Sequence, residues 1–171
     1  MEFTKKERTI KYVVYAVIIA VLSLLQNVGG LWFEIGGARC FFLIPAAVLL
    51  SLDEDEKTAA LIGLFAGLLW DITAAHHMGF NCLFIMVSCY IMSVLVTHLF
   101  RATFWVGTVG AVLFTFLYVL IYWLIFVLIK GGDGSGVAFF NFYLPSFFYT
   151  VVMTVVMNIA FVPLKRKLNK A

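Results

Sequence analysis

One carboxylate and two histidines stand close together in an otherwise apolar stretch of the chain. Asp71 falls inside the run GLFAGLLWDITAAHHMGF (63–80), and His76 and His77 follow it. Carboxylate and imidazole groups bind zinc, so a metal site is one interpretation. Adjacent histidines on a short turn point apart, however, and no fourth ligand is evident. We therefore interpret the histidines as part of an interfacial turn and expect neither a metal nor another cofactor.

Asp71 belongs to a helix face that also carries two glycines. It lies four residues after Gly67 and eight after Gly63, so all three residues share one side of a helix. Small residues at this spacing let helix backbones approach closely, which would direct the carboxylate toward a neighbouring helix. The carboxylate could act as a proton or ion relay, as a ligand contact or as a polar clasp between helices. A single acid favours the clasp, because relays usually use several.

Gln26 is the predicted partner of Asp71. The two expected helices run in the same direction, and both residues lie roughly 20 Å from the starts of their helices at ~1.5 Å per residue. The glutamine amide can donate two hydrogen bonds to a carboxylate. Backbone donors at Phe80 and Asn81 are competing partners, and Arg39 is a third.

The composition places these residues in a membrane protein. Of 171 residues, 64% are hydrophobic and 12% charged, and the mean hydropathy is +1.05. Uncharged stretches as long as a bilayer is thick predict an all-α integral membrane protein with one transmembrane domain covering residues 1–171. The expected spans are about 12–31, 38–52, 58–75, 80–100, 104–129 and 142–163. Each must be helical, since lipid offers the backbone no hydrogen bonds.

Basic residues are distributed unevenly between the two sides of this six-span topology. Ten of the twelve Lys and Arg residues fall on the side of the termini, and only Arg39 and Lys130 fall on the other. Positive charge is concentrated in cytoplasmic loops, so both termini are expected in the cytoplasm. The terminal clusters, which include Lys11 and Lys165, are interpreted as anchors near anionic lipid, and no nucleic-acid partner is expected.

The second span is the least regular of the six. Its 15 residues would extend roughly 22 Å, short of a ~30 Å apolar core, and Pro45 should kink or break it. We expect an irregular or tilted element that other helices shelter. The following run DEDEK (53–57) is interpreted as a solvated turn in preference to a metal site.

Small residues and cysteines allow further expectations about packing. Ala16 and Ala20 form a second pair at helical spacing, and either small-residue face could serve internal packing or a partner subunit. The three cysteines are Cys40, Cys82 and Cys89. Buried thiols are favoured over a Cys40–Cys82 disulfide. Motifs of nucleotide-binding loops, zinc proteases and serine hydrolases are absent from the sequence, so an enzyme is not expected.

Several features in one order resemble the rod shape-determining protein MreD family. LLQN (24–27) ends the first span, and LIPAAVLL (43–50) contains the proline. G-x-x-x-G-L-L-x-D (63–71) then leads through a short turn to Gly79. The chain departs from the family pattern after Pro45, where an acid is common, and in the turn 74–78, which usually carries a small residue and a proline.

This resemblance implies a non-enzymatic scaffold subunit of the bacterial cell-elongation machinery in the plasma membrane. Its partners would be the MreC scaffold protein, RodA with its penicillin-binding partner and the MreB cytoskeleton. The implied fold is similar to the substrate-binding subunit of energy-coupling-factor transporters, with six helices and an outward cavity. The alternative is therefore such a vitamin-transporter subunit, with Ala16 and Ala20 as a docking face.

Overall fold

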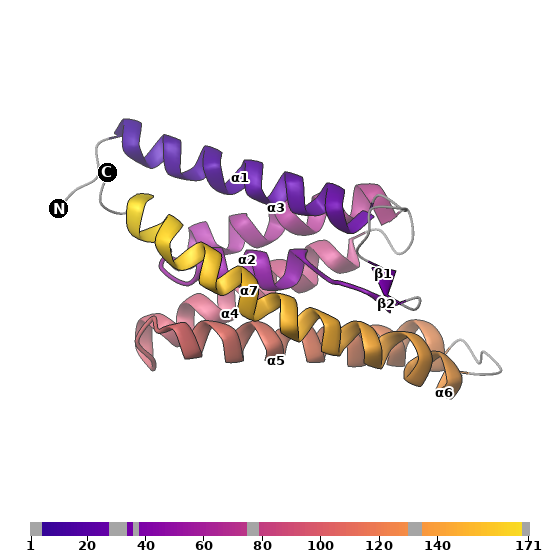
Figure 1. Cartoon of the computed structure of the whole chain (residues 1–171). Coiled ribbons are helices and arrows are strands. Elements are labelled where there is room, and N and C mark those ends of the chain that lie inside the picture. The colour runs from indigo at the N-terminus through magenta and orange to yellow at the C-terminus, as the bar shows by residue number, and fades with distance from the viewer. Residues whose placement is uncertain (1–4, 28–33, 36–37, 75–78, 130–134, 169–171) are drawn as a thin grey trace.

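The chain folds as a bundle of long helices around a short central one (Figure 1). The computed structural model describes residues 5–27, 34–35, 38–74, 79–129 and 135–168. The long helices are α1 (Lys5–Asn27), α3 (Glu56–Ala74), α4 (Phe80–His98), α5 (Phe104–Tyr122) and α7 (Leu144–Leu168). The shorter elements are β1 (Glu34–Ile35), β2 (Ala38–Arg39), α2 (Leu43–Ser51), the π-helix η1 (Trp123–Leu128), α6 (Ser135–Ala138) and the π-helix η2 (Phe139–Tyr143).

The bundle has two distinct ends. α1 begins and α7 ends at the same end, which we call the basal end (Figure 1). The opposite, distal end carries α6 and the antiparallel β1–β2 pair, in which Glu34 lies opposite Arg39. Because the helices reverse direction repeatedly between these ends, residues far apart in sequence meet at each of them.

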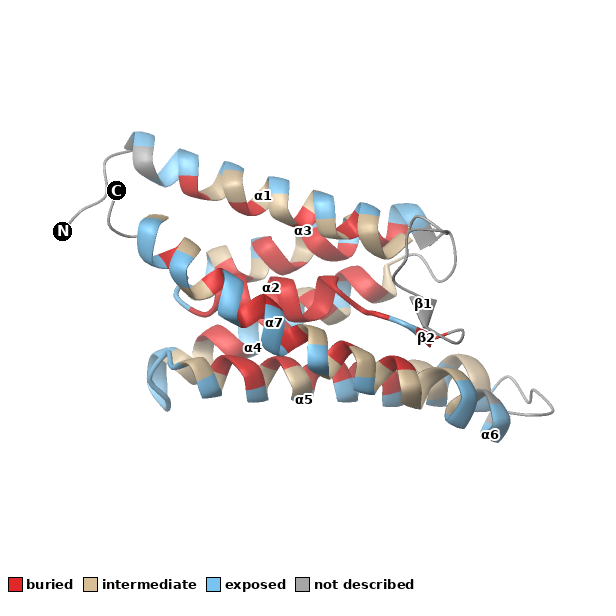
Figure 2. Cartoon of the chain, in the orientation of Figure 1, coloured by how far each residue is buried: buried red, intermediate tan, exposed pale blue. Residues whose placement is uncertain are grey.

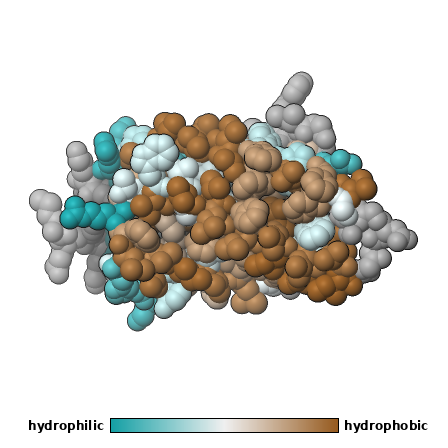
Figure 3. All heavy atoms as spheres, turned by 90° about the horizontal axis from the view of Figure 1, so that it is seen from below, coloured by the Kyte–Doolittle hydropathy of each residue, from teal (hydrophilic) through white to brown (hydrophobic). Residues whose placement is uncertain are grey.

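Four helical stretches of the described chain are long and apolar enough to cross a membrane. They are Arg8–Asn27, Phe80–His98, Phe104–Leu128 and Phe139–Leu168. Large hydrophobic side chains also remain on the outside of the bundle, where a soluble protein would carry polar ones. Figure 3 shows hydrophobic residues over most of the visible face and hydrophilic ones mainly near its ends. These features indicate an integral membrane protein.

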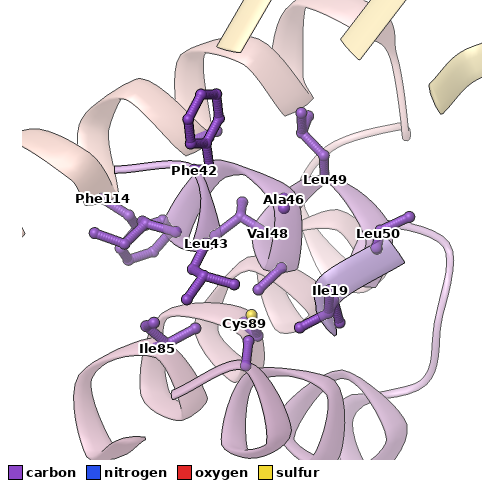
Figure 4. Close-up of a cluster of buried hydrophobic side chains, with 14 of the residues drawn as sticks. Ile19, Phe42, Leu43, Ala46, Val48, Leu49, Leu50, Ile85, Cys89 and Phe114 are labelled. Carbon is purple, nitrogen blue, oxygen red and sulfur yellow. The ribbon is translucent and has the colours of Figure 1, made fainter. Parts of the chain in front are cut away.

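The short helix α2 forms the centre of the core. All nine of its residues are buried, and Figure 2 shows it in red between the longer helices. Side chains from α1, α4 and α5 surround it, including Ile19, Ile85 and Phe114 (Figure 4). A helix that is apolar on every side can be stable only where other protein covers it completely.

The expectation for the second span was partly wrong. The helix covers only Leu43–Ser51. It is preceded by an extended segment, residues 38–42, which includes β2. Pro45 occupies the first turn, where a missing N–H removes no helical hydrogen bond, so it neither kinks nor breaks the helix. The expected shelter by other helices is confirmed, since Pro45 and its neighbours are fully buried.

Two other helix boundaries also differ from the expected ones. α1 begins at Lys5 and not near Tyr12, and α7 continues beyond Pro163 to Leu168. Hydropathy detects only the apolar part of a helix, whereas the helix itself continues into charged residues at the membrane surface. The three cysteines are free and buried, so the disulfide alternative was wrong.

Candidate functional site

Gly63 and Gly67 bring the backbones of α3 and α4 into direct contact. A Cβ atom added at Gly63 would lie 2.6 Å from the carbonyl oxygen of Ile85 and 2.8 Å from the Cα of Met86. A Cβ atom at Gly67 would overlap the Cα of Cys82. Backbone atoms occupy these positions, so no side chain fits without separating the helices. Of the two alternatives for this face, the structure therefore shows internal packing.

Asp71 lies on the same face, next to the start of α4, and only 4% of its surface is exposed. Its Oδ2 accepts hydrogen bonds from the backbone N–H groups of Gly79 and Cys82, each at 3.0 Å. The first N–H groups of a helix have no partner within the helix and favour a negative charge nearby. The carboxylate of Asp71 therefore caps α4 and ties it to α3, the contacts expected of a clasp.

Gly79 makes this cap possible. It adopts φ +93°, in the left-handed region, immediately before the first residue of α4. Glycine enters that region without the steric cost that other residues meet. In this conformation the Gly79 N–H donates to the Oδ2 of Asp71, directly before α4 begins.

The predicted pair of Asp71 and Gln26 was wrong. The Oε1 of Gln26 instead accepts the backbone N–H of Leu43, the first residue of α2, at 3.0 Å. The two side chains were placed correctly toward the distal end, but each binds a nearer helix start. Backbone donors were the right alternative for Asp71, although they come from Gly79 and Cys82 and not from Phe80 and Asn81.

Gln26 belongs to a set of side chains that bind the extended segment before α2. The backbone N–H of Arg39 donates to the Oγ of Ser146, and that of Phe41 donates to the Oγ1 of Thr150, both at 3.0 Å. With Leu43, three alternate residues thus donate to side chains of α1 and α7. Non-helical backbone is tolerated at membrane depth where protein groups satisfy it in this way.

Sequence reasoning missed the polar side of α7. Four buried polar residues recur every fourth position along this helix, namely Ser146, Thr150, Thr154 and Asn158. Besides binding the extended segment, this row contacts α5, because the Nδ2 of Asn158 donates to the carbonyl of Phe104 at 2.9 Å and to the hydroxyl of Thr108 at 2.7 Å. The four-residue spacing of polar groups in an apolar run was the signal that could have revealed it.

A second polar site lies at the basal end, around the turn between α2 and α3. Glu54 is buried there and forms an ion pair with Lys11 of α1. Its Oε2 accepts the hydroxyl of Tyr12 at 3.2 Å, and its backbone carbonyl accepts the hydroxyl of Ser93 at 2.8 Å. One acidic residue thus connects α1 and α4 to the turn.

The neighbouring Asp53 makes the corresponding connection to α7. Its Oδ2 lies 2.8 Å from the Nζ of Lys165, which is itself buried. The interpretation of this turn as solvated was therefore wrong for Glu54, whereas Asp53 stays exposed and pairs with Lys165 from there. The interpretation as anchors near anionic lipid was also wrong for Lys11 and Lys165, because both are buried and each is paired with an acid, which offsets part of the cost of removing the charge from water. The described residues include no group of three metal-binding side chains.

Asp55 of the same turn is also exposed, and it directly precedes the first residue of α3. Its Oδ1 accepts the Thr58 hydroxyl at 2.7 Å, and its Oδ2 accepts the Thr58 backbone N–H at 3.4 Å. The bond from the Thr58 hydroxyl lowers the pKa of the Asp55 carboxyl. Asp55 is thus an N-terminal cap, a role that its place before the helix could have indicated.

The remaining candidate residues take less prominent positions. Ala16 is half-buried and lines a shallow apolar groove between α1 and α3 with Ile62 and Phe65. Ala20 is half-buried one turn later. His76 and His77 lie outside the described residues.

Comparisons with models of known protein families, with curated proteins and with solved structures found no match.

Proposed function

We propose that this protein is a non-enzymatic membrane scaffold of the MreD type, which maintains rod shape and supports peptidoglycan synthesis in the bacterial plasma membrane. The observation that carries the proposal is the cap of α4 by Asp71. The residues on which the resemblance rests, from Gly63 through Asp71 to Gly79, form one structural unit in which two helices are locked together. A sequence pattern that forms a rigid helix pair suits a scaffold, which acts by binding partner proteins.

The use of polar groups supports a scaffold over an enzyme. Asp71 and Thr150 are buried and Gln26 is half-buried near the middle and distal part of the bundle, and each accepts a backbone N–H group. Polar side chains of a catalytic site would instead converge on a space where substrate could react. In the described chain these residues hold the backbone.

We further propose six membrane passes, a cytoplasmic basal end and a fold similar to energy-coupling-factor substrate subunits. Supporting this topology, the described basic residues Arg8, Lys57 and Arg101 lie near the basal ends of α1, α3 and α4. The extended segment with α2 would make the second pass. MreC, RodA with its penicillin-binding partner and MreB are the proposed protein partners.

Depletion of the protein in its own rod-shaped host tests the proposal. Cells should become round, and a plasmid copy with Gly110→Ala should restore the rod, because a Cβ atom there would meet only the flexible side chain of Met92. A copy with Gly67→Leu should fail, and MreC should no longer co-purify with it. Unchanged shape together with a defect in uptake of one vitamin would contradict the proposal and favour the transporter alternative.

A further inference from the structure

A cleft of about 350 Å³ opens at the distal end of the bundle. Its volume is near the lower end of the ~300–1,000 Å³ range of small-molecule sites. Elements from all parts of the chain contribute to its wall, including α1, β2, α3, α4, α5 and η2. A site of this size and composition is built by the fold as a whole and not by a single loop.

Aromatic rings form the apolar part of the cleft. The ring centroids of Phe41, Trp70 and Tyr118 lie 5.1 to 5.9 Å from one another. Each of these residues is buried and fixed by the others, so the surface they offer is preformed. Such a surface accepts a flat or apolar molecular body with little loss of side-chain freedom.

Three amide side chains line the cleft, and those of Gln26 and Asn81 have their oxygen atoms already engaged, whereas the NH₂ of Asn27 donates to Ser23. The Oε1 of Gln26 accepts the Leu43 backbone N–H, which can only donate, so the amide NH₂ is left for other partners. The Oδ1 of Asn81 accepts the Tyr118 hydroxyl at 2.7 Å. The NH₂ groups of Gln26 and Asn81 therefore remain as hydrogen-bond donors toward the cleft.

The Gln26 amide also shows that a partner is missing. Its Nε2 is buried and forms no hydrogen bond with any described residue. A buried donor without an acceptor costs free energy, which a bound oxygen atom would recover. The described chain satisfies almost all its other buried side-chain donors, so this one stands out.

Charge in the wall favours an anionic partner. Arg39 lies at the exposed rim and is the charged residue among the described residues that line the cleft, and although it already has a contact within the protein, its five N–H donors can serve a further partner. Asp71 is not part of the wall, and its Oδ2 is bound to the start of α4. A guanidinium beside amide donors is a typical environment for a carboxylate.

We propose that the distal cleft binds a small carboxylate that carries an apolar or aromatic body. The carboxylate oxygens accept from the Gln26 Nε2 and the Arg39 guanidinium, and the body lies against Phe41, Trp70 and Tyr118. This inference does not depend on the proposed function, because a scaffold and a transporter subunit could each use such a site.

Trp70 provides a reporter inside the cleft. The chain has four tryptophans, and replacing Trp32, Trp105 and Trp123 by phenylalanine leaves Trp70 alone. We would titrate this full-length variant in detergent with 3-phenylpropionate and with its neutral counterpart 3-phenylpropan-1-ol, and follow Trp70 fluorescence. The acid should give a saturable change and bind about tenfold more tightly than the alcohol, the effect of one charge-assisted hydrogen bond. No saturable response to the acid, or equal affinity for both probes, would overturn the proposal.

Two substitutions separate binding from folding. Gln26→Glu keeps an oxygen for the Leu43 N–H but replaces the donor with a negative charge, so affinity for the acid should fall about tenfold or more. Arg39→Gln should lower the affinity for the acid by a similar factor and leave the affinity for the alcohol unchanged. This variant still tests the site if Gln26→Glu folds poorly. Arg101→Gln, which removes an exposed charge outside the cleft, is the matched control. Unaltered affinity for the acid in Arg39→Gln would refute the site.

Discussion

The carboxylate of Asp71 accepts a hydrogen bond from the backbone N–H of Cys82, a residue eleven positions later on the next helix. Asparagine keeps an oxygen that can accept the same bond, whereas leucine leaves the Cys82 and Gly79 donors without a partner. We expect Asp71→Leu to lower the free energy of unfolding by about 1–3 kcal/mol and Asp71→Asn to lower it by less. Thermal unfolding in detergent measures both.

The outcome for Asp71→Asn also tests the role of the charge. Normal folding with complete loss of activity in the host would contradict the clasp and indicate a proton or ligand function. Partial or full activity would support it.

The contact of α3 with α4 predicts a clear hierarchy among glycine substitutions. Gly67→Ala should destabilise the protein by about 1–3 kcal/mol, because the new methyl group meets the backbone of Cys82. Gly110→Ala is the matched control within a membrane helix, because the side chain of Met92 can move aside. Unfolding temperatures of the two variants provide the comparison. Equal stability would mean that α3 and α4 are farther apart than the structure shows.

Thr150 provides a test of the bonds to the extended segment. Thr150→Val preserves shape but removes the acceptor of the Phe41 N–H, so we expect a loss of about 1–3 kcal/mol. Thr115→Val is a close control, since the Thr115 hydroxyl is equally buried and donates only to Ala111 of its own helix. Equilibrium unfolding of both variants would distinguish them. A larger effect at Thr115 would argue against a role for Thr150 in holding the segment.

The basal ion pair predicts a contrast between two acids. Removing the charge of Glu54 breaks its ion pair with the buried Lys11, so Glu54→Gln should cost about 3–5 kcal/mol. Glu56→Gln breaks only the exposed pair with His98, which should cost ~0–1 kcal/mol. Comparable unfolding curves for the two variants would show that Glu54 is not held in a buried pair.

The topology can be tested at Gly136. A Cβ atom there meets nothing within 4 Å, so Gly136→Cys should not disturb the fold. In a background that lacks Cys40, Cys82 and Cys89, a membrane-impermeant thiol reagent should label it in intact cells, because the distal end is expected outside. Labelling only after permeabilisation would invert the orientation.

The long helices and the glycine face could be predicted from the sequence because each depends on a local pattern. Apolar runs as long as the membrane is thick indicate helices whatever their neighbours are. The spacing of Gly63, Gly67 and Asp71 fixes them on one face, and a buried acid must face protein. These inferences need only the periodicity of a helix.

Partners chosen by the fold could not be predicted in this way. Gln26 and Asp71 do lie toward the same end of the bundle. Each, however, accepts hydrogen bonds from backbone N–H groups at the start of a nearby helix, α2 for Gln26 and α4 for Asp71. Similarly, Glu54 looks solvated in the run DEDEK, and only the approach of α1 encloses it with Lys11. Sequence distance and depth do not report which backbone N–H group is nearest, so such pairs require the structure.

The extended segment before α2 also has a consequence for how the protein is made. Two of its N–H groups bind Ser146 and Thr150, 107 and 109 residues farther along the chain. During synthesis these acceptors leave the ribosome long after the N–H groups that they bind, so the centre of the molecule stays unfinished until α7 is inserted. A chain truncated before α7 would keep two N–H groups of its core segment without these acceptors. Insertion of α7 thereby completes the hydrogen bonding of the core segment.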